Sequence, residues 1–216
     1  SYVKSIKIKN ENELLQVLSN SEKELILDFD SPIDITHNII INQSIEKLIF
    51  RGGDLSDTFI LNSVDSSFFT LDIGENVKEI QLENLSIKGN LFFNNNQKIL
   101  INSVFITGNI HSNFEKHINE YFRIYNLTYK PSNLSIENCI HLDGGNIEIY
   151  NSNFRGSISC QKRLLNFNGL NVYKLFIMNS KFNGEYQCSL INVDNALNVN
   201  IEKSSFEKAY SEFYGG

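Results

Sequence analysis

Two stretches of this chain repeat one phrase: Ile147-Glu-Ile149-Tyr-Asn151-Ser-Asn-Phe154-Arg-Gly156 and Leu175-Phe-Ile177-Met-Asn179-Ser-Lys-Phe182-Asn-Gly184. In each stretch two apolar residues alternate with variable ones, an Asn follows, and a Phe and a Gly end the phrase. Shorter copies begin at Ile80 and Ile99. A phrase that returns about every two dozen residues predicts a solenoid, in which each repeat stacks on the one before it.

The spacing of these phrases predicts the kind of solenoid. The apolar pair that opens the phrase begins at Leu48, Ile80, Ile99, Phe122, Ile147, Leu175 and Val199, at intervals of 32, 19, 23, 25, 28 and 24 residues. Each interval also holds other short strand-like pieces, such as residues 134–136 and 190–193. Three short strands per turn predict an all-β fold, a right-handed parallel β-helix of about seven coils, with like residues stacked about 4.8 Å apart. We expect residues 1–216 to form a single β-helix domain.

Stacking predicts which residues line the interior and which make the turns. The inward ladder should contain Leu82, Ile101, Ile124, Ile149, Ile177 and Ile201, and a second, aromatic ladder should contain Phe154, Phe182 and Phe206. Asn makes up 31 of the 216 residues and tolerates the left-handed backbone conformation of tight turns. We therefore expect turns at Asn84, Asn126, Asn138, Asn151 and Asn179, a series that Ser103 and Lys203 interrupt.

Two helices are expected beside the strands. Residues 11–20 place Leu14, Leu15, Val17 and Leu18 on one face, which predicts an N-terminal capping helix. Ser112 and Glu115 have the spacing of a capping box, which predicts a short inserted helix over residues 113–120. That helix would either pack over the side of the solenoid or project as a recognition element.

The composition and the acidic residues argue against several function classes. The net charge is −6 without a basic block, which argues against nucleic acid, and no apolar run is long enough to cross a membrane. The chain has two clusters of acidic residues: Asp54 and Asp57, which lie beside Arg51, and the group of Asp28, Asp30 and Asp34. We interpret the acids of both clusters as loop and turn-forming residues. The four His residues lack metal-ligand spacing. We expect no enzyme activity, no metal and no cofactor.

The three cysteines leave two alternatives open. Cys160 and Cys188 each lie four residues after a phrase-ending Gly, so they should stack in neighbouring coils. They could form a disulfide or remain two stacked thiols in the core. Cys139 is left over and is expected to be buried.

The variable positions of the phrase should point outward, and in three coils they are not all polar. Tyr125, Tyr150 and Met178 fall in one outward column, with Phe176 in the neighbouring column, and Tyr121 lies at one edge. Exposed apolar strips commonly mark interaction sites, so these five residues are the candidate partner-binding site. A neighbouring loop could instead cover them, and stacked rings could also hold sugars.

The repeated phrase and the N-terminal helix resemble the right-handed parallel β-helix superfamily, the pectate-lyase-like fold. The clustered Asp residues, the Gly-His-Gly motif and the Arg-x-Lys motif of its hydrolases are missing here. The Asn-rich coils also resemble the β-helical repeats of anaerobic-fungal cellulosome scaffoldins. That resemblance implies a secreted, cohesin-like module that binds dockerin modules of secreted enzymes. Four Asn-x-Ser/Thr sequons fit secretion, and the chain reads as a fragment of a longer repeat protein. The alternative is a carbohydrate-binding or polysaccharide-lyase-like β-helix that acts on plant cell-wall polysaccharide.

Overall fold

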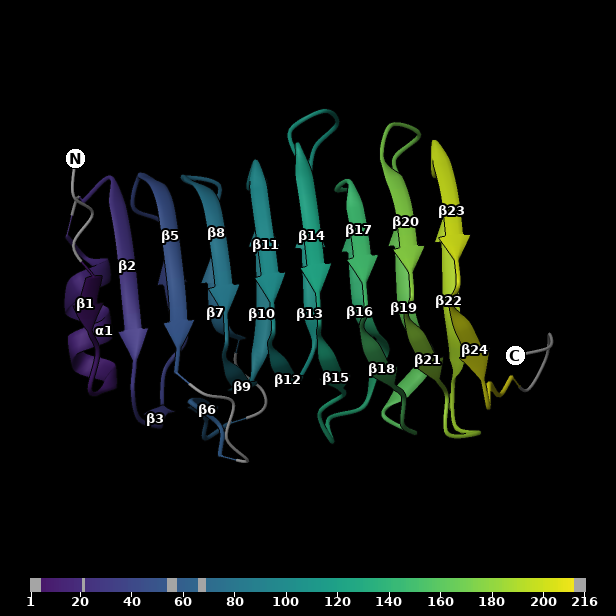
Figure 1. The fold of residues 1–216 in the computed structure, drawn as a ribbon, viewed down its shortest axis with the longest axis horizontal. Helices are drawn as coiled ribbons and strands as arrows, with labels where there is room; N and C mark the ends of the chain where they lie inside the picture. The colour runs from purple at the N-terminus through teal and green to yellow at the C-terminus, as the bar shows by residue number, and fades with distance from the viewer. Residues whose placement is uncertain (1–4, 21, 54–57, 66–68, 212–216) are drawn as a thin grey trace.

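A computed structural model describes residues 5–20, 22–53, 58–65 and 69–211, and it shows strands stacked into three parallel sheets (Figure 1). We call the three sheets A, B and C, with the strands of each given in the next paragraph. The chain passes through them in that order and then returns to sheet A one level further along. This all-β arrangement is compatible with a parallel β-helix. One helix, α1 (Glu11–Leu18), is present in the described residues and lies at the N-terminal end of the stack (Figure 1).

The strands are short and regular. Sheet A consists of β1 (Ser5–Lys7), β2 (Glu24–Phe29), β5 (Ile45–Gly52), β8 (Val77–Glu83), β11 (Lys98–Asn102), β14 (Tyr121–Tyr125), β17 (Ile147–Tyr150), β20 (Lys174–Met178) and β23 (Asn198–Glu202). Sheet B consists of β3 (Ile33–Ile35), β6 (Leu61–Ser63), β9 (Ser86–Lys88), β12 (Phe105–Thr107), β15 (Thr128–Lys130), β18 (Asn153–Arg155), β21 (Lys181–Asn183) and β24 (Ser205–Glu207). Sheet C consists of β4 (Ile39–Ile41), β7 (Phe69–Ile73), β10 (Asn90–Asn94), β13 (Ile110–Asn113), β16 (Ile136–Asp143), β19 (Cys160–Asn168) and β22 (Ser189–Asp194).

The repeated phrase sets the register of sheet A. The seven residues that open the phrase, from Leu48 to Val199, pair with one another in one unbroken column. The predicted inward ladder from Leu82 to Ile201 forms the next inward column, and its members are buried except Ile201, which is 42% exposed. Ile201 is more exposed because it lies on β23, the last strand of the sheet, with no further strand stacked on it among the described residues.

The aromatic ladder is also confirmed. The rings of Phe154 and Phe182 stack with centroids 4.5 Å apart, and those of Phe182 and Phe206 lie 5.1 Å apart. Tyr129 extends the ladder at its other end, with its ring centroid 6.0 Å from that of Phe154. Parallel stacking brings these side chains together because they occupy one register column of sheet B.

From β8 onward, each strand of sheet A is followed by a turn in which one residue has the left-handed backbone conformation. Asn84, Asn126, Asn151 and Asn179 have φ values between 49° and 52°, as the Asn-rich composition predicts. Ser103 and Lys203 take the same conformation, with φ values of 54° and 48°, so they interrupt the series in residue type but not in backbone. The prediction for Asn138 is wrong, because this residue lies inside β16.

A different Asn series fills the turn that leads from sheet C into sheet A. The Asn119 side chain donates to the backbone oxygen of Asn96 (2.9 Å), and that of Asn146 donates to the backbone oxygen of Asn119 (2.9 Å). The Asn96 side chain in turn donates to the backbone oxygens of Gly74 and Val77. Each amide therefore satisfies backbone groups of the level below it.

The N-terminal helix agrees with the sequence, and the inserted helix does not. Asn10 caps α1, since its side chain accepts a hydrogen bond from the backbone N–H of Glu13 at 2.9 Å. Residues 114–120 form an irregular segment with a turn at residues 116–118, and Ser112 lies in β13 with its side chain buried. Tyr173 engages the backbone of this segment, because the Tyr173 hydroxyl donates to the Glu115 oxygen and accepts from the N–H groups of Ile118 and Asn119.

Neither alternative considered for Cys160 and Cys188, a disulfide between them or two free thiols, holds. Cys160 is bonded to Cys139, with Cα atoms 5.2 Å apart, and Cys188 is a buried free thiol. β19 begins at Cys160 and pairs with β16, which carries Cys139 at the adjacent level, whereas Cys188 falls in the turn before β22. The register between β16 and β19 shifts near this point, and spacing from the phrase-ending Gly does not reveal that shift.

Candidate functional site

The predicted site residues lie together on the outer face of sheet A. Their columns are in register, since Arg123, Glu148 and Phe176 pair in one column and Tyr125, Tyr150 and Met178 pair in the next. We call Tyr125, Tyr150, Phe176 and Met178 the aromatic strip; all four are half-buried. β14, β17 and β20 lie next to one another in the stack (Figure 1), so residues about 25 positions apart in sequence become neighbours in space.

The rings of the aromatic strip are in direct contact. The Tyr125 and Tyr150 rings stack nearly parallel, with centroids 4.8 Å apart and 9° between their planes. The Phe176 ring lies 5.4 Å from that of Tyr150 and is tilted by 43°. Contacts of this kind hold the rings in place, and all three side chains remain half-exposed.

An ion pair is set into this surface. The Arg123 guanidinium donates from Nε to the Glu148 carboxylate at 3.0 Å, and the Tyr150 hydroxyl donates to the same carboxylate oxygen at 3.3 Å. The hydrogen bond with Glu148 raises the pKa of Arg123. Partial burial, followed by the charge of Glu148, raises the pKa of Tyr150, so its phenol stays protonated at neutral pH.

Tyr121 lies at the edge of the aromatic strip, as predicted, but on a strand instead of beside a helix. It is the first residue of β14, and the Arg123 guanidinium lies over its ring at 4.4 Å from the centroid. Burial raises the pKa of Tyr121 as well.

A depression of about 440 Å³ adjoins the strip, lined by Glu120, Asn146, Glu148, Tyr150, Lys174 and Phe176. In Figure 1 the loops that enter β14 and β20 project beyond the loop that enters β17, and the depression lies at the start of these strands. Its walls carry both charge signs together with two aromatic rings. Sequence columns predict the strip, but they do not predict this depression, because it depends on the lengths of the loops.

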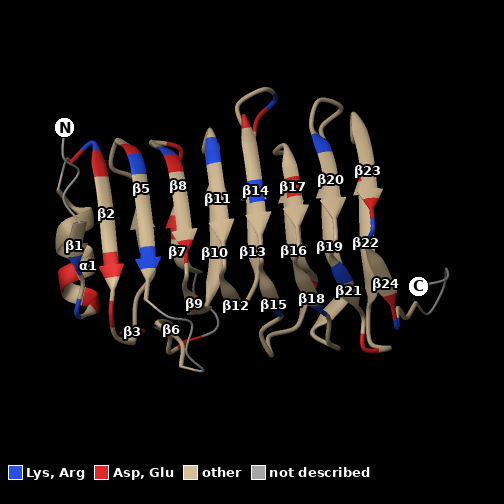
Figure 2. Ribbon diagram, viewed as in Figure 1, with Lys and Arg blue, Asp and Glu red and all other residues tan. Residues whose placement is uncertain are grey.

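The acidic clusters considered in the sequence do not converge. Asp28 binds the Arg51 guanidinium at 2.8 Å, Asp30 binds Lys7 at 2.7 Å, and Asp34 accepts from Asn62 at 2.6 Å. Each carboxylate thus has its own surface partner. Asp54 and Asp57 lie outside the described residues. Figure 2 shows cationic and anionic residues interspersed along the sheets, which fits the lack of a basic block.

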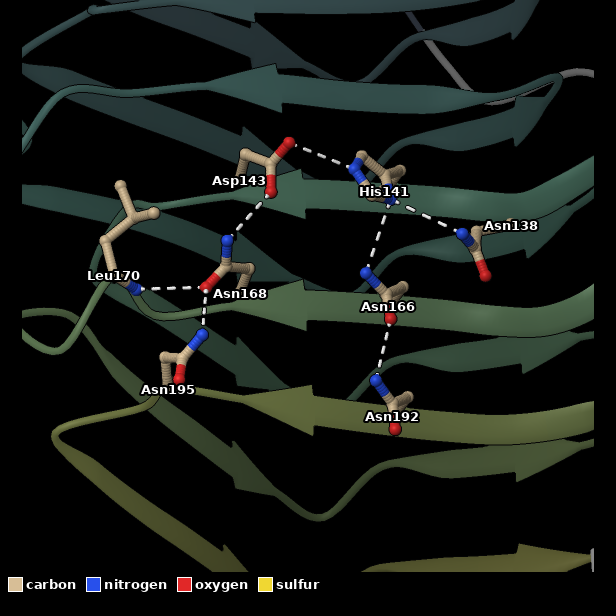
Figure 3. Close-up of polar contacts among 8 residues, drawn as sticks. All are labelled: Asn138, His141, Asp143, Asn166, Asn168, Leu170, Asn192 and Asn195. Atoms are coloured by element: carbon tan, nitrogen blue, oxygen red, sulfur yellow. Dashed lines mark hydrogen bonds and ion pairs between the residues drawn. The ribbon is translucent and has the colours of Figure 1, made fainter. Parts of the chain in front are cut away.

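The outer face of sheet C carries a polar network that the sequence analysis missed (Figure 3). The His141 ring lies 3.0 Å from Asp143 through Nε2 and 3.3 Å from the Asn166 amide through Nδ1, and Asn192 donates to Asn166 at 2.9 Å. A second row runs from Asp143 through Asn168 to Asn195. The sequence signal for this network is the alternation of polar with apolar side chains along consecutive Asn-rich strands.

The sheet C network suits a structural role. Both ring nitrogens of His141 face a partner, so the imidazole is oriented on two sides. The His111 ring lies beside it, tilted by 45° with ring centroids 6.2 Å apart, and burial together with the neighbouring His141 lowers the pKa of His111. Among the described residues, no group of three or more His, Cys, Asp or Glu side chains converges as a metal site would require.

Two further findings, on membrane-spanning helices and on similarity to known proteins, give no functional assignment. Across the described ranges, no helix is long and apolar enough to cross a bilayer. Comparison with known protein families, with curated proteins and with solved structures finds no match to this chain.

Proposed function

We propose that this chain is a non-catalytic, secreted binding module whose aromatic strip docks a protein partner. The observation that carries the proposal is a row of half-exposed rings in register on a flat sheet face, with the Arg123–Glu148 ion pair set among them. Tyr and Arg are enriched among the residues that contribute most to protein interfaces. Removing the exposed part of the rings from water favours association, and the ion pair adds specificity.

The resemblance to scaffoldin repeats suggests the kind of partner. We propose that this chain is a right-handed β-helix of about seven coils. As its partner we propose, as the first choice, a dockerin-like module of a secreted enzyme. A pull-down from native secretions with the purified chain would test this choice. Recovery of several secreted enzymes that share one small module would support it.

The site is tested by a double variant. Tyr150→Ala with Phe176→Ala should weaken partner binding at least about tenfold, because central aromatic residues of an interface commonly cost about 2 kcal/mol or more on truncation. The fold should persist, since both side chains point outward. Gln81→Ala with Glu83→Ala is a matched control, because these residues occupy the same two outward columns on β8.

Three outcomes separate the explanations. Unchanged affinity in the folded Tyr150/Phe176 variant would remove the aromatic strip as the docking site. Loss of folding would show that the strip is covered core. Weakened binding in the control variant as well would point to a partner that covers most of sheet A.

Polysaccharide is the second candidate ligand, and the Tyr150 and Phe176 rings that line the depression favour it. Sugar rings stack on exposed aromatic faces, so retention on insoluble polysaccharide with no protein recovered would favour this alternative. Release of reducing ends or unsaturated products from pectin, alginate or xylan would instead overturn the non-catalytic assignment.

A further inference from the structure

A second depression, of about 770 Å³, lies at the corner between sheets B and C near the last levels of the stack. Three segments at adjacent levels surround it: the turn between β18 and β19, the turn between β21 and β22, and residues 210–211 after β24. It is remote in the fold from the aromatic strip, since it involves neither β14, β17 nor β20. Its volume falls within the range of about 300–1,000 Å³ that small-ligand pockets occupy.

Bonds between levels hold the walls of this corner pocket. The Ile158 N–H donates to the Gln187 side-chain oxygen at 3.0 Å, and the Tyr210 N–H donates to the Cys188 oxygen at 3.0 Å. The Cys139–Cys160 disulfide anchors β19 immediately before the pocket residues Gln161 to Arg163. Because the walls are tied together before any ligand arrives, binding loses less conformational entropy.

Large apolar side chains stand exposed at the corner pocket. Ile158 is 78% exposed, Tyr186 is 70% exposed and Tyr210 is 48% exposed. Most other large apolar side chains of the described levels are buried in the core. The pocket therefore offers ring and methyl surface that a ligand could remove from water.

The charge of the pocket lining is opposite to that of the whole chain. The chain has a net charge of −6, yet the described residues of the lining include Lys162 and Arg163 and no Asp or Glu. Lys162 already binds Glu137 at 2.6 Å. The Arg163 guanidinium donates to the Lys162 backbone oxygen, and no described carboxylate lies within salt-bridge distance of it. A planar guanidinium with spare donors suits a bidentate carboxylate.

We propose that the corner pocket binds an acidic sugar, a monosaccharide residue that carries a carboxylate. Tyr186 and Tyr210 supply apolar ring surface for the sugar, Arg163 receives the carboxylate, and the amides of Gln161 and Gln187 face the hydroxyl groups. This inference is independent of the proposed protein-binding role, because the two sites share no residue.

The test is a titration of the isotope-labelled protein followed by NMR. The probes are N-acetylneuraminic acid and the methyl glycoside of glucuronic acid, with methyl glucoside as the neutral control. We expect saturable shifts at the amides of Ile158, Tyr186 and Tyr210 with one or both acidic sugars. Arg163→Gln should weaken that binding roughly tenfold, since it removes charge-assisted hydrogen bonds. Arg51→Gln, the same change near the other end of the stack, should have no effect.

Several results would overturn the proposal. The acidic sugars could fail to shift these amides at millimolar concentration, or methyl glucoside could bind as tightly as they do. An acetylated Glu-Glu dipeptide that binds as well as the sugars would replace the sugar with a peptide ligand. Retained binding in folded Arg163→Gln would remove the carboxylate contact. The Tyr150→Ala and Phe176→Ala variant should still bind the sugar, which separates this site from the aromatic strip.

Discussion

Ile177 and Ile201 provide a matched test of how stacking creates the core. They pair with each other in the same inward column, on β20 and β23, but Ile177 is fully buried and Ile201 is 42% exposed. The substitution to Ala removes the same three carbons at both positions. Any difference between the two losses of unfolding free energy therefore measures the contribution of the strand that is stacked on the residue.

The magnitudes follow from burial. Three carbons at about 0.8 kcal/mol each give a transfer loss of about 2.4 kcal/mol at Ile177, and the closed cavity left behind brings the range to about 2–5 kcal/mol. At Ile201 the lost area is smaller and the space opens to solvent. We expect Ile201→Ala to cost about 1 kcal/mol.

Urea unfolding followed by circular dichroism measures both losses, since the chain has no Trp to report by fluorescence. The slope of free energy against urea should stay constant across wild type and both variants. Equal losses at the two positions would refute the reasoning, because they would mean that Ile201 is as well covered as Ile177. A loss below about 1 kcal/mol at Ile177 would show that this column is not core.

Three further predictions concern the turns, the cysteines and acid. Asn179 has φ of 49°, so Asn179→Gly should leave the unfolding free energy nearly unchanged while Asn179→Val lowers it by roughly 1–2 kcal/mol in the same urea assay. Peptide mapping without reductant should find Cys139 linked to Cys160, and Cys188 should react with iodoacetamide mainly after denaturation, because burial raises its pKa. The hydrogen bond from Arg51 lowers the pKa of Asp28, so its contribution to stability is present above the unfolded pKa and is lost as pH falls through the folded pKa. Acid titration of Asp28→Asn should accordingly show a smaller loss of stability below about pH 4 than wild type shows.

The sequence predicts the parts of this fold that depend on repetition. Apolar residues recur at the phrase openings, and parallel stacking then forces Ile149 over Ile124 and Phe182 over Phe154. The same logic places Tyr125 beside Tyr150 without any knowledge of their contacts. In each case, counting residues from one repeated phrase to the next predicts which side chains stack in one column.

The errors fall where the repeat changes length. The segment between β13 and β14 has a capping-box pattern, but Tyr173, more than fifty residues away, binds its backbone and holds it in an irregular conformation. The shifted register between β16 and β19 gives Cys160 a different partner from the one that phrase spacing indicates. Long-range side-chain contacts and register shifts decide both cases, and neither leaves a local signal in the sequence.

The outer faces of sheets A and C differ in what they offer a ligand. On sheet C the amides of Asn166 and Asn192 and the His141 ring bind one another, so a ligand would have to replace hydrogen bonds that are already made. On sheet A the Tyr and Phe side chains of the aromatic strip contact one another through their rings and leave apolar surface in water. Covering that surface yields free energy without breaking a hydrogen bond, apart from any bond remade at Glu148. This difference, and not the total polarity of either face, is why the binding role is proposed for sheet A.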